Sequence, residues 1–154
     1  MVTAYKRQIW EVVASTAAIT GTSLNSLGNG SAASGSGIAL NADTTHLQFT
    51  CTFAFSTTTG LTDFEGPGLY IRWSSDGGST YEPSGTVSKL PMSPIVFVGQ
   101  NNTDVQTRTV EVERPRGATN FTATLVGRGG VALASSGNTL TVIQEGERLV
   151  TVEV

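Results

Sequence analysis

The sequence is poor in charge. Only 21 of its 154 residues are charged, 9 lysines and arginines against 12 aspartates and glutamates, whereas about a quarter of the residues in an ordinary soluble domain carry a charge. The formal net charge is −3 and the isoelectric point is near 5.0. These values exclude a strongly basic surface that attracts nucleic acid, so we expect no nucleic-acid partner.

Cysteine, histidine and long apolar runs are also scarce. A single cysteine and a single histidine exclude a disulfide framework, a Cys/His zinc site and most histidine-based catalysis. No apolar run approaches the about 18 residues of a transmembrane helix, so we expect no membrane partner. Trp10-Glu11 interrupts the apolar stretch that follows Lys6-Arg7, which predicts synthesis in the cytoplasm without a signal peptide.

Small residues take the place of the missing charges. The chain contains 23 threonines, 15 serines and 18 glycines. Threonine is β-branched and suits a pleated, half-exposed strand, so this composition favours β-structure. Disorder is excluded because 38% of the residues are hydrophobic and fall in patterned runs.

The strongest structural pattern lies at residues 46–55. Apolar and polar residues alternate there, which predicts a core strand with one buried face. The apolar face consists of Leu47, Phe49, Cys51, Phe53 and Phe55. We interpret Cys51 as a small buried hydrophobic residue rather than a reactive thiol.

Later segments repeat this pattern between glycine and proline clusters. The segments are residues 69–73, 95–98, 105–113, 121–125, 139–143 and 148–154. Turn signals, Gly146 among them, separate the segments. The spacing predicts an all-β fold, an antiparallel β-sandwich or jelly roll of about eight strands with an N-terminal arm.

The first 45 residues differ from the rest. Residues 5–19 are moderately apolar without a clean period and fit a strand or a short helix, and residues 24–37 have the composition of a flexible linker. We therefore divide the chain into residues 1–45, an N-terminal arm or first strand plus a Gly/Ser-rich linker, and residues 46–154, the β-sandwich domain. The arm packs on a neighbouring subunit in one interpretation and forms the first strand of the same sandwich in the other.

Candidate catalytic groups are few and isolated. His46 is the only imidazole and begins a strand, Asp63 and Glu65 share a loop, and Glu111 and Glu113 share one strand face. None of these groups has a partner in the pattern that acid/base or nucleophilic chemistry requires. We expect no catalytic, cofactor-binding or metal-binding residue, no cofactor and no enzymatic activity.

Two local features allow more specific interpretations. Residues 74–81, Ser-Ser-Asp-Gly-Gly-Ser-Thr-Tyr, match the Asp-box pattern of sialidases and other β-proteins, which we interpret as a stabiliser of a hairpin turn. Arg114 and Arg116 flank Pro115 in a predicted turn. They either form ion pairs with an acidic partner or are solvated turn residues.

Four segments resemble small β-sandwich virion structural proteins of tailed bacteriophages. These segments are residues 69–81, 108–118, 121–125 and 132–140, and they run from an Arg-Trp strand into an Asp-Gly turn, then to Pro-Arg-Gly-Ala and to Ser-Gly-Asn. The resemblance implies a capsid decoration (cement) protein that binds the outer shell and stabilises capsomer contacts. It further implies a location on the virion capsid surface, and as partners the major capsid protein and copies of the chain itself as a homotrimer.

In such an assembly, Tyr5, Ile9 and Trp10 are the predicted partner contacts, together with Arg114 and Arg116. The alternative is a phage tail or fibre adaptor, or a sandwich module that binds host glycans through Trp73, Tyr70 or Tyr81. A small hydrolase built on the Asp-box or on the acidic loop is a third and weaker hypothesis.

Overall fold

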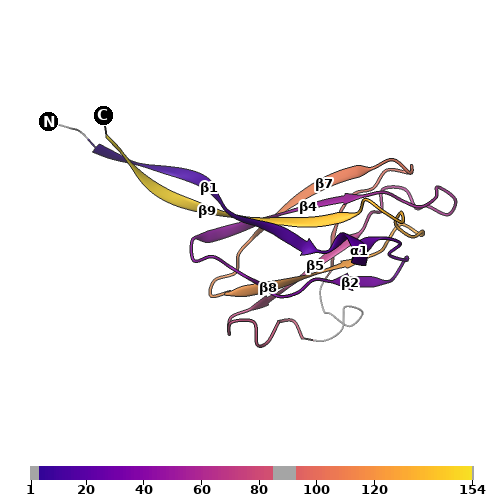
Figure 1. Ribbon diagram of the computed structural model, residues 1–154, viewed down its shortest axis with the longest axis horizontal. Helices are drawn as coiled ribbons and strands as arrows, with labels where there is room; N and C mark the ends of the chain where they lie inside the picture. Colours follow the sequence, from indigo (N-terminus) through magenta and orange to yellow (C-terminus); the bar gives the residue numbers. More distant parts are fainter. Residues whose placement is uncertain (1–3, 85–92, 154) are drawn as a thin grey trace.

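The structure, a computed structural model, describes the backbone of residues 4–84 and 93–153 and, within these, the side chains of residues 11–84, 93–147 and 151. Nine β-strands in two antiparallel sheets form the framework of this described part (Figure 1). The first sheet has the order β1-β9-β4-β7 and the second the order β2-β8-β5-β6, with β3 also paired to β8. The elements are β1 (Ala4–Ile19), α1 (Gly21–Leu24), β2 (Ala32–Ser34), β3 (Ile38–Ala39), β4 (Thr44–Phe53), β5 (Gly68–Ser74), β6 (Ile95–Val96), β7 (Gln106–Glu113), β8 (Asn120–Val126) and β9 (Thr139–Glu153). The all-β sandwich expected from the sequence is confirmed.

The core lies between the two sheets. Phe49 of β4 and Phe121 of β8 meet edge to face across it, with ring centroids 5.8 Å apart, an arrangement that aromatic pairs prefer. Both side chains are fully buried. Sandwich cores of this kind arise because alternate residues of each strand point to the opposing sheet.

The alternation at residues 46–55 predicts β4 well. In the structure this strand begins at Thr44 and ends at Phe53, and its odd-numbered residues from Leu47 onward are buried. On its other face, Thr50 pairs with Thr109 of β7 at 3.0 Å between hydroxyl oxygens, and Thr52 pairs with Thr107 at 3.1 Å. A row of threonines therefore forms one end of this outer face, which continues with Gln48 opposite Glu111 and His46 opposite Glu113.

Strand β9 differs from the expectation of two strands. It runs without interruption from Thr139 to Glu153, through the predicted turn at Gly146. A Cβ at Gly146 would lie 2.3 Å from the carbonyl oxygen of Asp43, so the glycine serves a close backbone approach inside a strand rather than a turn.

Residues 24–37 also differ from the expected flexible linker. Leu24 and Leu27 are buried in the core, and β2 pairs with β8. A Cβ at Gly35 would lie 1.9 Å from the carbonyl oxygen of Ala18. The small residues here allow close packing on the sandwich, a role that composition alone does not distinguish from flexibility.

Candidate functional site

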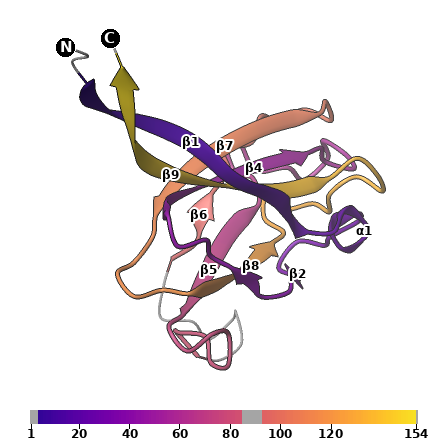
Figure 2. The same ribbon diagram turned by 60° about the vertical axis from the view of Figure 1, so that its left-hand side comes forward.

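The most distinctive feature of the fold is a two-stranded ribbon that projects from the sandwich. Strand β1 pairs with β9 along its length, from Ala4 opposite Glu153 to Ile19 opposite Leu140. Figures 1 and 2 show the outer half of this pair extending away from the body, with both chain ends at its tip. We call residues 4–11 and 146–153 the outer ribbon.

The outer ribbon has two open edges within the described chain. β1 is the edge strand of its sheet, and β4 pairs with β9 only as far as Gly146. Beyond that residue the outward backbone groups on both sides of the ribbon have no neighbouring strand in the described residues. Such rows of N–H and C=O groups are templates for pairing with another chain.

The base of the ribbon is held firmly to the body. The buried Gln144 of β9 accepts hydrogen bonds at its Oε1 from the Asn41 N–H (2.9 Å) and the Thr44 hydroxyl (2.8 Å), and its Nε2 donates to the Ala39 carbonyl (2.9 Å). The side-chain amide thus satisfies three polar groups of the segment that leads into β4. The ribbon leaves the body from a fixed point.

The structure places the predicted partner contacts at different positions. Tyr5, Ile9 and Trp10 belong to β1 in the outer ribbon, but their side chains lie outside the described residues. Arg114 donates to the carbonyls of three segments, Asn41 (2.9 Å), Thr44 (2.9 Å) and Ala118 (2.9 Å). A structural role for Arg114 was not anticipated from the sequence, because its acceptors are backbone groups brought close only by the fold.

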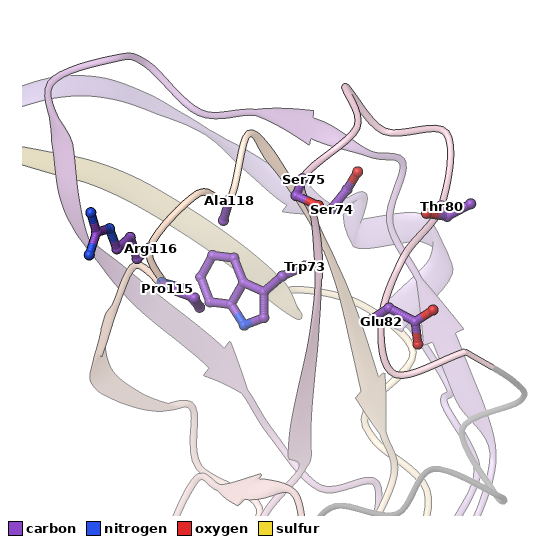
Figure 3. Close-up of a pocket in the computed structure, with 8 residues that line it drawn as sticks. All are labelled: Trp73, Ser74, Ser75, Thr80, Glu82, Pro115, Arg116 and Ala118. Atoms are coloured by element: carbon purple, nitrogen blue, oxygen red, sulfur yellow. The ribbon is translucent and has the colours of Figure 1, made fainter.

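Arg116 lies in a second candidate site, a pocket beside Trp73. Figure 3 shows this pocket, which has a volume of about 190 Å³ and is formed by β5, the Asp-box turn and the turn that precedes β8. Its lining residues are Trp73, Ser74, Ser75, Thr80, Glu82, Pro115, Arg116 and Ala118. Of the three aromatic residues considered as a glycan platform, Trp73 is the one that lines it. Sequence spacing does not reveal the site, since its two turns are about forty residues apart.

The Asp-box turn is a self-contained hydrogen-bond network. One oxygen of Asp76 accepts from the Ser74 hydroxyl (2.6 Å) and from the Ser79 and Thr80 backbone N–H groups (both 3.0 Å), and the other accepts from the Thr80 hydroxyl (2.7 Å). The Ser74 hydroxyl bond and the further bonds from Thr80 and Ser79 lower the pKa of Asp76 below its ordinary value. The carboxylate is committed to the turn, which supports its interpretation as a hairpin stabiliser.

The other titratable candidates form no reactive arrangement. Cys51 is buried, and burial raises the pKa of its thiol to about 12, so it remains protonated and unreactive. Asp63 accepts a hydrogen bond from Asn101 (2.7 Å), and Glu65 pairs with Arg128 at 3.8 Å. Among the residues described by the structure, no group of three His, Cys, Asp or Glu residues could hold a metal ion.

Within the described part of the chain, no helix is both long and apolar enough to span a membrane.

Comparison with known proteins finds similarity only among solved structures. No protein-family profile matches the sequence, and no curated protein matches it. The similar solved structures include a family GH115 4-O-methyl-α-glucuronidase with specificity for decorated arabinogalactans (10% identity, TM-score 0.45, 94% of this chain and 18% of that one). The chain thus spans less than a fifth of the glucuronidase.

Two further similar structures are close to this chain in length. The Desmodium yellow mottle tymovirus structure shows 11% identity and a TM-score of 0.40, over 99% of this chain and 90% of that one. A family 35 carbohydrate-binding module from Clostridium thermocellum shows 15% identity and a TM-score of 0.38, over 90% of each chain. Similarity at this level transfers neither an activity nor a functional residue to this chain.

Proposed function

We propose that this chain is a non-enzymatic assembly protein whose outer ribbon binds a neighbouring protein subunit, and that it acts as a capsid decoration protein on a tailed-bacteriophage virion. The observation that carries the proposal is the outer ribbon itself, a pair of strands away from the body with both edges open.

An outer ribbon of this kind gains stability from a partner. A two-stranded antiparallel pair is marginally stable at best in water, and at least three strands or a packed face are needed for independent stability. Strand addition along an open edge supplies main-chain hydrogen bonds, while alternate side chains supply specificity.

The residue types in the outer ribbon suit an interface. Tyr5, Ile9 and Trp10 place two aromatic residues and one aliphatic residue in a single eight-residue stretch. Buried aromatic anchors contribute much of the binding energy in protein interfaces. The threonine pairs of β4 and β7 add an uncharged stretch to the surface, which imposes no charge repulsion on a neighbouring subunit there.

The shell protein of a phage capsid is the partner we propose, with copies of the chain itself as further neighbours. The resemblance of residues 69–143 to phage virion proteins supports this partner and a location on the capsid surface. Identical subunits usually assemble into closed symmetric oligomers, and the homotrimer that we propose among them follows from the resemblance to phage virion proteins. No active site is required for such a role.

The test is co-sedimentation of the purified protein with capsids that lack it. A variant with Tyr5→Asp, Ile9→Asp and Trp10→Asp is expected to lose capsid binding, because the charges would be buried in the interface. Phe64→Asp is the matched control, since Phe64 is 73% exposed and lies outside β1 and β9. It should bind as the unmodified protein does.

A truncation gives an independent version of this test. Removing residues 1–11 takes away one strand of the outer ribbon and leaves the buried Ala18 and Ile19 in place, so the sandwich should keep its circular dichroism spectrum. Binding at wild-type strength by this truncated protein would refute the proposal. Copy number separates the two phage roles, because a decoration protein occurs in proportion to the shell protein and a tail adaptor in a few copies per particle.

A further inference from the structure

The pocket beside Trp73 is a separate site from the outer ribbon. Its lining residues come from β5, the Asp-box turn and residues 115–118, and β1 and β9 contribute none of them. A ligand bound there would leave the outer ribbon accessible to its own partner.

The walls of the pocket are preformed. Trp73 and Glu82 exchange two backbone hydrogen bonds, at 3.0 and 2.8 Å, and the Thr119 N–H donates to the Ser74 carbonyl at 2.7 Å. The indole packs on the buried Phe121 with ring centroids 6.0 Å apart. Because both turns are tied to β5, little conformational entropy is lost when a ligand binds.

Several polar groups at the pocket have no partner within the described residues. Within the described residues, no hydrogen bond is made by the Trp73 indole N–H, the Ser75 hydroxyl or the Arg116 guanidinium. By contrast, Arg114, two residues before Arg116, donates to the backbone carbonyls of Asn41, Thr44 and Ala118. Glu82 accepts the Ser84 N–H through one carboxylate oxygen at 2.9 Å and keeps the other available. The pocket thus combines several donors with one strong acceptor.

The arrangement of these groups defines the chemistry of the ligand. In Figure 3 the Arg116 and Glu82 side chains lie on opposite sides of the Trp73 ring, with the guanidinium and the carboxylate directed away from it, and both residues are exposed. One positive and one negative group leave the pocket neutral, which disfavours a highly charged ligand. A flat aromatic face prefers C–H groups with partial positive charge, and the polar groups around it require a ligand with hydroxyls that both donate and accept.

We propose that this pocket binds one neutral pyranose unit of a glycan. The C–H face of the sugar packs on the Trp73 indole, and the exposed Arg116 and Glu82 side chains turn towards the bound ring, where its hydroxyls accept from the guanidinium and donate to the carboxylate. The volume of about 190 Å³ is below the roughly 300–1,000 Å³ of pockets for larger ligands, so the site holds a single ring rather than an extended chain.

The experiment is an NMR titration of the full-length protein with methyl glucoside, methyl galactoside, methyl mannoside and, as a charged probe, methyl glucuronide. We expect the Trp73 indole N–H signal to shift with at least one neutral sugar and to shift less with the glucuronide. The absence of a shift with all three neutral sugars at tens of millimolar would overturn the proposal, as would stronger binding of the glucuronide.

Substitutions at the rim test the assignment of each group. Arg116→Ala and Glu82→Gln are each expected to weaken binding of the responding sugar about tenfold, which corresponds to the loss of one charge-assisted hydrogen bond. Arg128→Ala and Glu65→Gln are matched controls, because this ion pair lies outside the pocket. Equal binding by the Arg116 variant and its control would refute the role of Arg116.

The outcome is independent of the proposed capsid role. The protein that lacks residues 1–11 should bind the sugar with unchanged affinity, since the outer ribbon contributes nothing to the pocket. Loss of sugar binding in that truncated protein would contradict a site confined to β5 and the two turns.

Discussion

The inner and outer halves of the β1–β9 pair have the same hydrogen-bond pattern and very different surroundings. In the inner half, β4 lies on the other side of β9 and the second sheet covers the pair, so Ile19, Leu140 and Val142 are buried. In the outer half, no third strand lies beside β9 beyond Gly146 within the described residues, and the described side chains of Glu11, Glu147 and Thr151 are exposed. Backbone pairing is therefore common to both halves, and a third strand with a covering sheet distinguishes the inner one.

This contrast shows where a partner would add stability. Net stabilisation by a hydrogen bond in water is only about 0.5–1.5 kcal/mol, because the unfolded chain bonds to water instead. Burial of apolar area provides most of the driving force for folding. The outer ribbon has no third strand within the described residues, so a partner strand would supply what β4 supplies to the inner half, and the following predictions test this difference between the two halves.

The largest difference is expected in amide hydrogen exchange of the isolated protein. Amides of Leu140 and Val142 should exchange only through global unfolding, which costs about 5–15 kcal/mol in a typical domain. Amides of residues 5–11 and 147–153 should exchange within about tenfold of the rate in an unstructured chain. Equal protection of the two halves would show that the outer ribbon is stable without a partner.

Loss of core volume should destabilise the body and not the outer ribbon. Phe121→Ala removes the ring that packs on Phe49 and Trp73 and is expected to lower the free energy of unfolding by about 3–5 kcal/mol. Urea denaturation measures the change. Val12→Ala serves as the control and should change stability by no more than about 0.5 kcal/mol. A small effect of the Phe121 substitution would contradict the assigned core.

A smaller effect is expected at the boundary between the halves. Gln144→Ala leaves the Asn41 N–H, the Thr44 hydroxyl and the Ala39 carbonyl without their partner and should cost about 1–3 kcal/mol, measured by the same denaturation. Gln48→Ala is the control, because Gln48 lies on the face of β4 that points away from the core. If the two variants are equally stable, Gln144 does not anchor the base of the ribbon.

The smallest effect concerns the Asp-box turn, an exposed part of the body that satisfies its own polar groups. Hydrogen bonds from Ser74, Thr80 and Ser79 lower the pKa of Asp76 in the folded protein. Its contribution to the free energy of unfolding is therefore present above the unfolded pKa of about 3.9 and is lost as the pH falls below that value towards the folded pKa. Asp76→Asn should flatten this part of the pH profile of the urea midpoint. An unchanged profile would contradict the role of Asp76.

The sequence predicts the strands whose two faces differ. In β4 the alternation is nearly perfect because one face meets the core and the other bears threonine, so the period of two is visible without a structure. The course of β9 was predicted incorrectly because Gly146 has the same local signal in a turn and in a close approach to Asp43. Residues 24–37 show the same ambiguity, since small polar residues are typical of linkers and of tight packing.

The candidate sites depend on contacts that a sequence pattern does not encode. Tyr5, Ile9 and Trp10 were singled out as partner contacts from their residue types, and this remains a prediction. Trp73 and Arg116 line one pocket because β5 and β8 pair with Trp73 opposite Phe121. Neither the pocket nor the anchoring bonds of Gln144 and Arg114 leaves a local signal, since their partners are distant in the chain.

By themselves, the low charge, the high threonine content and the alternation of apolar residues determined that this is a β-protein whose exposed strand faces are rich in threonine. Local residue choice is sufficient for that conclusion, because strand faces and turns are selected over a few residues at a time. Only the tertiary structure decided that β1 and β9 extend past the sandwich as a ribbon with open edges. That outcome depends on where the neighbouring strand β4 begins and where the opposing sheet ends, which is a property of the whole fold.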